Sequence, residues 1–159
     1  MIHHRWHPLD DVFVWLSKVG GYGLIWLGFG LALSLVWRRA TPFVLVLLAD
    51  AAADGLATIL KVVVGTHRPS DGGPLIAIPH SDSFPSGHTA TSFACATVLA
   101  ALVPRAAPAF YLLALAIGYS RIYVGVHWPL DVVGGAVLGV ATALLLLAVA
   151  RQRSARRRR

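Results

Sequence analysis

One apolar stretch decides the fold: VVGGAVLGVATALLLLAVA, residues Val132–Ala150, which continues directly into RQRSARRRR, residues Arg151–Arg159. A helix needs about 20 apolar residues, each rising about 1.5 Å, to cross the hydrocarbon layer of a bilayer. Arginine and lysine collect at the cytoplasmic ends of such helices, where they meet anionic lipid. The stretch therefore predicts a membrane-spanning helix followed by a basic cytoplasmic tail, residues 151–159, that binds anionic lipid.

The composition of the whole chain also indicates a membrane protein. Of 159 residues, 57% are hydrophobic and 13% are charged, and the mean hydropathy is +0.68, which is too apolar for an ordinary soluble domain. Backbone groups in lipid must be hydrogen-bonded internally, and the apolar runs lack the alternation of barrel strands. The sequence predicts an all-α integral membrane bundle, a single domain over residues 1–159, with five clear transmembrane helices. The four further apolar runs are Gly21–Trp37, Phe43–Val64, Thr89–Val103 and Ala109–Val124.

The N-terminal region, residues 1–20, differs from these runs. Its segment Leu9–Val19 carries apolar residues at helical spacing but is short for a full span, so an interfacial or partly inserted helix is expected. Asp10 and Asp11 interrupt the region, so no cleavable signal peptide is expected. A frayed terminus is predicted for the upstream histidines, which resemble a metal-binding tract only faintly: His3, His4 and His7.

The basic residues predict the orientation. If the run Gly21–Trp37 points inward, most of the lysines and arginines fall on one side, which should be cytoplasmic. The chain is then a multi-pass protein of a bacterial-type cytoplasmic membrane with a cytoplasmic C-terminus. The formal charge of +7 raises the question of a nucleic-acid partner. None is predicted, because no aromatic or groove-reading module accompanies the basic tail. The single cysteine, Cys95, excludes an intramolecular disulfide and any multi-cysteine metal site. The sequence indicates no oligomeric state.

Three polar motifs interrupt the apolar sequence: KVVVGTHRP at Lys61–Pro69, PSGH at Pro85–His88 and SRIYVGVHWPLD at Ser120–Asp131. The predicted topology brings all three to the extracytoplasmic end. Two arginines there offer planar forks that match phosphate oxygens, and a lysine adds a third positive charge. A helix that begins at PSGH would point its first N–H groups at an anion. Taken singly, Lys61 could equally be a snorkelling side chain. A plain helix start is the less favoured alternative for PSGH.

A histidine and a carboxylate complete the chemistry. His127 and Asp131 are four residues apart at the start of the last helix, with Pro129 suited to its first turn. The carboxylate can then hold one ring nitrogen while the other attacks phosphorus, and His88 can protonate the departing oxygen. Either histidine alone would more often be structural. Their combination with three cations predicts phosphoryl transfer.

Together, the three motifs resemble the signature of the type 2 phosphatidic acid phosphatase superfamily, in particular its membrane branch and the bacterial polyprenyl diphosphate phosphatases. Each motif is weak alone, but the three in this order and spacing are specific. The resemblance implies that His127 is a nucleophile that forms a phosphohistidine, that Asp131 orients it, and that His88 is the general acid. It implies a six-helix core, which the short N-terminal helix would complete, and it implies neither a cofactor nor a catalytic metal. It also implies the phosphate ligands Lys61, Arg68, Ser86, Gly87 and Arg121.

Several polar residues beside the motifs are candidates for supporting roles. Asp50 and Asp54 share a helical face with Lys61, and a network to Lys61 or Arg121 is favoured over a proton path. His67 could touch substrate, although an outward-facing imidazole is the simpler interpretation. Residues 65–87 are predicted to be the extracytoplasmic active-site loop. Within it, the segment from Ser70 to Phe84 is as readily a lid as an ordinary connector.

These observations predict hydrolysis of a lipid phosphate at the outer face of the membrane. The favoured substrate is a polyprenyl diphosphate, such as undecaprenyl or decaprenyl diphosphate, on the grounds of topology and family analogy. Phosphatidic acid, phosphatidylglycerol phosphate and a polyprenyl-phospho-sugar are the alternatives. A hypothesis from another class is a non-catalytic lipid-phosphate binder or a transporter subunit, for which both histidines would be dispensable.

Overall fold

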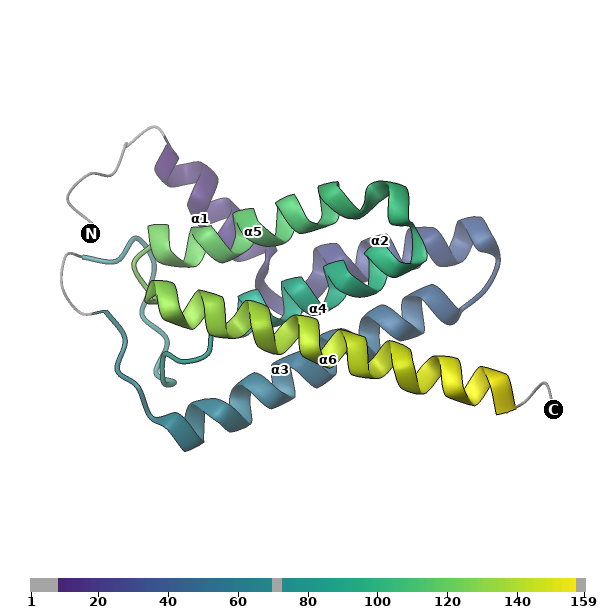
Figure 1. Cartoon of the computed structure of the whole chain (residues 1–159). Coiled ribbons are helices and arrows are strands. Elements are labelled where there is room, and N and C mark those ends of the chain that lie inside the picture. Colours follow the sequence, from purple (N-terminus) through teal and green to yellow (C-terminus); the bar gives the residue numbers. More distant parts are fainter. Residues whose placement is uncertain (1–8, 70–72, 157–159) are drawn as a thin grey trace.

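The computed structural model describes residues 9–69 and 73–156, and every regular element among them is a helix (Figure 1). The all-helical fold predicted from the sequence is therefore confirmed. The histidines predicted to fray, His3, His4 and His7, lie outside the described residues. The elements are α1 (Asp10–Val19), the short 3-10 helix η3 (Gly21–Gly23), α2 (Leu24–Trp37), α3 (Thr41–Val64), α4 (Gly87–Leu102), the short 3-10 helix η4 (Pro104–Ala106), α5 (Ala107–Tyr123) and α6 (Pro129–Arg156).

At least two helices can cross a membrane by length and composition. These are α3 and α6, and α1 with α2 forms a pair that passes the same test as one segment bent by 59°. Helix α4 is apolar but shorter. Large apolar side chains on the outer faces are exposed, among them Val62 at 80% and Leu130 at 75% exposure. Such surfaces suit contact with lipid tails. The number of spans, five or six, remains a prediction.

Helix α6 extends beyond the apolar run that predicted it. It begins at Pro129, in agreement with the preference of proline for the first helical turn, and it continues through Arg156. The first part of the predicted basic tail is therefore helical and continuous with the apolar segment. Arg151, Arg153 and Arg156 therefore belong to α6.

Helix α4 lies at the centre of the bundle, packed against α3, α5 and α6. Two glycines allow α6 to approach the α4 backbone closely. A Cβ atom at Gly139 would overlap the carbonyl oxygen of Ala90, and one at Gly135 would lie 2.5 Å from the carbonyl oxygen of Ser86. Small residues at this spacing are typical of close helix pairs in membranes. The contact brings the first turn of α6 against the first turn of α4.

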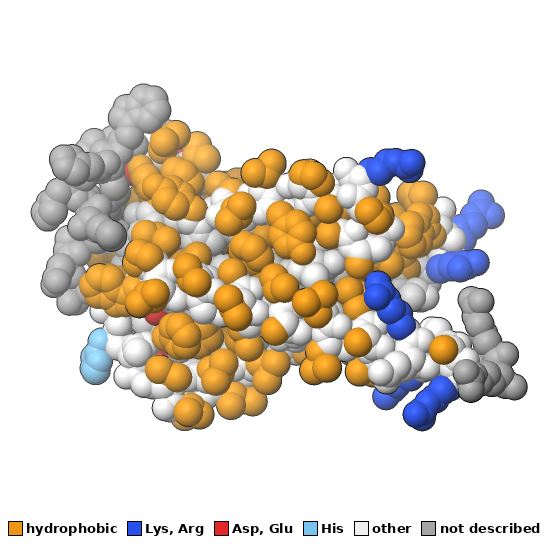
Figure 2. Space-filling model, in the orientation of Figure 1, with side chains coloured by type: hydrophobic (Ala, Val, Ile, Leu, Met, Phe, Trp, Pro, Cys, Tyr) orange, Lys and Arg blue, Asp and Glu red, His pale blue; other side chains and the backbone are white. Residues whose placement is uncertain are grey.

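The connections divide between the two ends of the bundle (Figure 1). The α3–α4 and α5–α6 connections lie at one end, and the α2–α3 and α4–α5 connections lie at the other, with the end of α6. Figure 2 shows lysine and arginine side chains gathered at this second end and apolar side chains along the flank. The exposed arginines of the α2–α3 and α4–α5 connections and of the end of α6 are Arg38, Arg39, Arg105, Arg151, Arg153 and Arg156.

Candidate active site

The three motifs meet at the end of the bundle opposite this arginine cluster. Lys61 lies in the last turn of α3, Arg121 in the last turn of α5 and Asp131 in the first turn of α6. The connections between these helices supply the other groups. Arg68 follows α3, and its Nη1 atom lies 3.2 Å from Nε2 of His127, in the turn before α6. The ends of three helices and the connection after α3 thus converge on one imidazole.

Asp131 holds the other side of that ring. Its Oδ2 atom lies 3.3 Å from Nδ1 of His127, which is the pairing expected for residues four apart in a helical turn. The same oxygen accepts a 2.8 Å hydrogen bond from the backbone N–H of Trp128 and another from the hydroxyl of Ser83. A carboxylate with several donors has a fixed position. Asp131 can therefore orient the ring without rotating itself.

These contacts determine the tautomer of His127. A guanidinium only donates hydrogen bonds, so Nε2 must accept from Arg68 and the proton of the neutral ring must be on Nδ1. Burial lowers the pKa of His127 to about 4; the hydrogen bond to Asp131 raises it, and the charges of Arg68, Arg121 and Lys61 lower it further. The ring is thus neutral at pH 7. Its free electron pair, on Nε2, faces the cationic side of the site.

Arg68 is anchored mainly by the loop that precedes α4. Its Nε atom donates to the carbonyl of Ser81 at 2.7 Å, and Nη1 donates to the carbonyl of Val126 at 2.8 Å. Its Nη2 atom donates to the hydroxyl of Ser81 and the carbonyl of Asp82, both at 3.2 Å. Burial lowers the pKa of the Arg68 guanidinium, and the charges of Asp131 and Asp82 oppose that effect. The guanidinium therefore joins the loop to the turn that carries His127.

The ammonium group of Lys61 is bound by backbone carbonyls of the loop before α4. Its ammonium donates to the carbonyl oxygens of Asp82 at 2.8 Å, Ser83 at 3.0 Å and Pro85 at 2.8 Å. An ammonium has three N–H donors, so these carbonyls use them all. Lys61 lines the same cavity as His127. Its contact with a phosphate group remains a prediction, whereas its contact with the loop is observed.

The PSGH motif forms the start of α4. Ser86 is the residue before the helix and is fully buried; its N–H donates to the backbone carbonyl of Asp131 at 2.9 Å, and its hydroxyl accepts from Thr89 at 3.0 Å. Gly87 and His88 follow in the first turn and line the cavity beside His127. The structure thus brings the predicted helix N-terminus to the site, and Ser86 also links α4 to α6.

Arg121 is 3% exposed, and its Nη1 atom is hydrogen-bonded to the hydroxyl of Ser17 in α1. Its Nε atom has no hydrogen-bond partner among the described residues. Helix α1 packs on α5, and the rings of Phe13 and Tyr123 lie 4.2 Å apart. Ser17 was missed in the sequence, where its only signal is a position one helical turn after Phe13 on the same face. Helix α1 is therefore a wall of the site.

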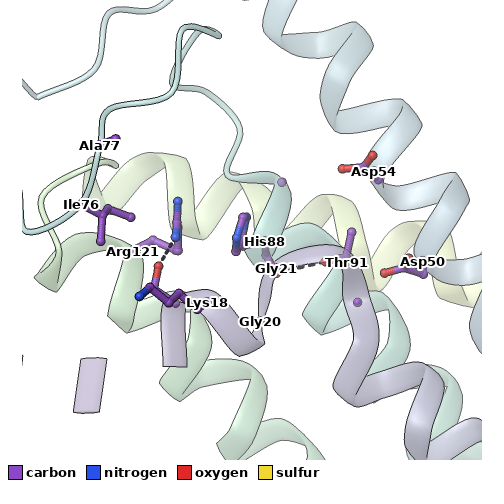
Figure 3. A pocket seen from close by; sticks show the side chains of 13 residues that line it. Lys18, Gly20, Gly21, Asp50, Asp54, Ile76, Ala77, His88, Thr91 and Arg121 are labelled. Atoms are coloured by element: carbon purple, nitrogen blue, oxygen red, sulfur yellow. Dashed lines mark hydrogen bonds between the residues drawn. The ribbon is translucent and has the colours of Figure 1, made fainter. Parts of the chain in front are cut away.

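Two cavities adjoin here. The smaller, about 350 Å³, contains His127, Lys61 and Arg68, and the larger, about 750 Å³, is bordered by α1, η3 and α3. Figure 3 shows the larger one, with His88 between Arg121 and Gly21. A Cβ atom at Gly21 would lie 3.3 Å from Nε2 of His88, so the bare backbone keeps this space open. The residues that line both cavities are Asp54, Gly87, His88 and Arg121.

The predicted network of Asp50 and Asp54 to Lys61 or Arg121 is not formed. Lys61 binds carbonyls and Arg121 binds Ser17, and among the described residues neither is paired with an aspartate. Asp54 is two helical turns below Lys61, which is about 10 Å of rise and too far for contact. Instead it lines both cavities, whereas Asp50 lines the larger one and lies against Gly23.

His67 is not brought to the site. The residue is exposed, and it lines a separate groove with Phe84 and Trp128, outside the cavity that holds His127. Its carbonyl accepts a 3.1 Å hydrogen bond from the indole of Trp128. The outward-facing interpretation of this histidine is therefore the correct one, and a direct role with substrate is not supported by its position.

Known proteins are similar to this chain in fold and in sequence. The crystal structure of LpxE from Aquifex aeolicus superposes with a TM-score of 0.76 at 33% identity, covering 92% of this chain and 90% of that one. A lipid A 1-phosphatase from Rhizobium johnstonii is 36% identical over 122 residues, which are 72% of this chain and 48% of that protein. An undecaprenyl-diphosphatase from Sulfolobus acidocaldarius is 32% identical over 137 residues, 82% of this chain and 66% of that protein.

The chain spans about half the length of that lipid A 1-phosphatase. The family comparison, however, covers nearly all of the bundle. The sequence profile of the PAP2 superfamily matches residues 23–155, which include all three motifs and every helix from α2 to α5 together with nearly all of α6. With helices, motifs and site geometry in agreement, the chain belongs to the PAP2 superfamily, and its apolar helices make it a multi-pass membrane protein.

Proposed function

We propose that this protein hydrolyses the terminal phosphate of a membrane lipid through a phosphohistidine on His127. One observation carries the proposal: the electron pair on Nε2 of His127 faces a cavity that Arg68, Arg121 and Lys61 also line. Asp131 holds the opposite nitrogen at 3.3 Å. This combination supplies a fixed, neutral nucleophile beside positive charge that can stabilise a phosphoryl group during transfer.

The reaction has two displacement steps. In the first, Nε2 of His127 forms a bond to phosphorus while the bond from phosphorus to the leaving oxygen breaks, and protonated His88 gives that oxygen its proton. In the second, His88 takes a proton from water, the water oxygen bonds to phosphorus, and the bond from phosphorus to Nε2 breaks to release inorganic phosphate. His88 suits both steps because it lines both cavities.

Arg68 has to change partners for the first step. Without substrate, its Nη1–H is directed at the attacking electron pair of His127. A phosphoryl oxygen is a charged acceptor and forms a stronger hydrogen bond with a guanidinium than a neutral imidazole does. Substrate binding would therefore draw Arg68 onto the phosphate and leave Nε2 free to attack.

The proposed substrate is a polyprenyl diphosphate such as undecaprenyl or decaprenyl diphosphate. The similarity to an undecaprenyl-diphosphatase supports this choice. A phosphorylated glycolipid or polyprenyl-phospho-sugar is the second candidate, because the similarity to LpxE and to a lipid A 1-phosphatase covers most of this chain. Phosphatidic acid and phosphatidylglycerol phosphate complete the set. The larger cavity, on the far side of His88, has room for the group that leaves.

The proposed site faces outward from a bacterial cytoplasmic membrane, with the C-terminus in the cytoplasm. The gathering of exposed arginines at the opposite end of the bundle supports this orientation (Figure 2). These arginines, including Arg151 and Arg153, would bind anionic lipid at the cytoplasmic surface. The proposed reaction needs no metal. Among residues 9–69 and 73–156, no three His, Cys, Asp or Glu side chains are grouped to hold one.

The experiment is phosphate release in detergent with a chelator present, from a panel of lipids that contains each proposed substrate. Intact protein, His127→Ala and His88→Ala are compared, and both variants are expected to lose nearly all turnover. Undiminished release by His127→Ala, or a strict requirement for Mg²⁺, would contradict the mechanism. Binding of every lipid without turnover of any would favour the binder or transporter subunit. The lipid with the highest kcat/KM identifies the substrate class.

A further inference from the structure

Ser83 is an unusual residue for a connection between helices because it is fully buried. Its hydroxyl is hydrogen-bonded to Oδ2 of Asp131 and lies 3.4 Å from Nδ1 of His127. An ionised carboxylate only accepts, so the hydroxyl proton points at Asp131 and the oxygen of Ser83 faces the proton on Nδ1. Ser83 therefore contacts both members of the pair that the proposed mechanism uses, although it touches neither substrate nor phosphorus.

The backbone of Ser83 is fixed on both sides. Its N–H donates to the carbonyl of Thr66 at 2.8 Å, and the next N–H, that of Phe84, donates to the hydroxyl of Thr66 at 2.8 Å. Its carbonyl accepts from Lys61, which also binds the carbonyls of Asp82 and Pro85. Three carbonyls bound by one ammonium hold the segment against the end of α3.

We propose that Ser83 is a positioning residue for the nucleophile His127, and that Lys61 acts on the same imidazole by fixing the segment that carries Ser83. The inference rests on the proposed function, since it concerns the nucleophile of that reaction. Lys61 then has a role that does not depend on contact with phosphate. Asp131 and Ser83 contact the imidazole of His127 directly, and Lys61 acts on it through the backbone of Ser83.

The arrangement has a chemical consequence that a purely structural role would lack. The Ser83 proton shares Oδ2 of Asp131 with Nδ1–H of His127. Removing the hydroxyl leaves that oxygen a stronger acceptor for His127, which stabilises the protonated ring and raises the pKa of His127 above its value of about 4. It also removes a contact that limits rotation of the ring. Turnover should fall, while the ligands of the phosphate stay in place.

The test measures kcat, KM and the pH profile of kcat/KM on the best lipid of the panel. Ser83→Ala should lower kcat by about tenfold, leave KM within about threefold and move the acid limb of kcat/KM to higher pH. Ser83→Thr, which keeps the hydroxyl, should recover part of kcat and restore the acid limb. The matched control is Ser92→Ala, which removes another fully buried hydroxyl that accepts from Trp26 at 3.2 Å, away from the site. Its acid limb should not move.

The role of Lys61 is tested with a double-mutant cycle. Lys61→Met should shift the acid limb in the same direction as Ser83→Ala, and the double variant should lose less kcat than the product of the two single losses. Loss of the Lys61 charge would by itself raise the pKa of His127. Lys61→Arg, which keeps the charge, is therefore the deciding variant; it should show the same shift in weaker form, and it also serves where Lys61→Met does not fold. Multiplicative losses with an unmoved acid limb would overturn the role of Lys61.

A Ser83→Ala variant with the acid limb and kcat of the intact protein would overturn the inference while leaving the proposed function standing. The two failures are distinguishable, because an active His127→Ala variant would contradict the proposed function itself. Each comparison uses preparations that elute as a single species from size exclusion in detergent.

Discussion

Nη1 of Arg68 and Nε2 of His127 lie 3.2 Å apart, so the electron pair proposed to attack phosphorus is hydrogen-bonded to a residue that is itself a proposed phosphate ligand. This hydrogen bond would keep Nε2 from attacking until an anion binds and takes the place of the ring as the acceptor. It also adds a positive charge beside a buried imidazole, which favours the neutral ring. In the proposed mechanism, Arg68 would thus couple the binding of phosphate to the release of the nucleophile.

Arg68→Lys should therefore affect both binding and attack. A lysine keeps the charge but lacks the fork that joins the loop, the turn at Val126 and the ring. We expect KM to rise and kcat to fall, with a combined loss in kcat/KM of about 100-fold. Steady-state kinetics on the preferred lipid measure this. A loss confined to KM would mean that Arg68 binds phosphate without acting on His127.

The pH profile should reveal the low pKa of His127. Only the neutral ring attacks, and its pKa of about 4 lies below the ordinary value of 6.5. The part of the acid limb due to His127 should therefore appear near pH 4, and kcat/KM should not fall through protonation of this residue between pH 7 and 5. Because Asp131 raises this pKa, Asp131→Asn should move the limb lower. An upward shift would contradict the assignment of the tautomer.

Ser17→Ala tests whether α1 belongs to the site. The change leaves Nη1 of Arg121 without its partner, next to an Nε atom that already has none among the described residues. We expect about a tenfold loss in kcat/KM, since a mispositioned guanidinium binds the phosphoryl group less well. Ser34→Ala is the matched control, because its buried hydroxyl accepts from Phe43 at 2.9 Å on the opposite side of the bundle. Equal losses of kcat/KM in both variants would mean that Ser17 contributes only to the stability of the fold.

Asp54→Asn tests the charge shared by the two cavities. Asp54 lines both, so its carboxylate lies beside the place proposed for the phosphate and the leaving group. For a diphosphate, removing that charge should lower KM by a few-fold, because two anions no longer approach each other. Asp11→Asn, an exposed change in the first turn of α1, is the control. A raised KM for Asp54→Asn would show that the carboxylate instead accepts hydrogen bonds from the substrate.

Gly139→Ala tests the α4–α6 contact. The added Cβ would overlap the carbonyl oxygen of Ala90, so the helices must separate or the protein must lose roughly 1–3 kcal/mol of stability. Gly55→Ala is the matched control, since a Cβ at Gly55 meets nothing within 4 Å and alanine favours a helix. Thermal unfolding in detergent should show a lower Tm for Gly139→Ala and an unchanged or higher Tm for Gly55→Ala.

Local chemistry made much of this protein predictable from its sequence. Apolar length identified the helices, and the connections between α3 and α4 and between α5 and α6 carried the polar motifs to one end. His127 and Asp131 were predictable as a pair because their spacing is set by a single helical turn. These inferences needed only the order of apolar segments and polar motifs along the sequence, together with the requirement that the helices lie in a bilayer.

Contacts between distant segments were not predictable in the same way. Ser83 and Ser17 carry no pattern of their own, and their roles depend on which helix ends lie opposite them. Lys61 had the charge of a phosphate ligand, but nothing in its neighbourhood of sequence indicated three carbonyls around it. The favoured partners of Asp54 were not predictable either, because Lys61 binds three backbone carbonyls and Arg121 binds Ser17, and neither contact has a signal in the sequence.

The close contact of Gly135 with Ser86 has a consequence for how the protein works in different surroundings. His88 belongs to α4, and His127 is held by Asp131 in the first turn of α6. The spacing between the proposed acid and the proposed nucleophile therefore depends on how closely these two helices pack. Lateral pressure from the bilayer, which favours close helix packing, would then also favour the catalytic alignment. We expect a harsh detergent to abolish turnover while the helical content is still intact, and transfer into lipid nanodiscs to restore it.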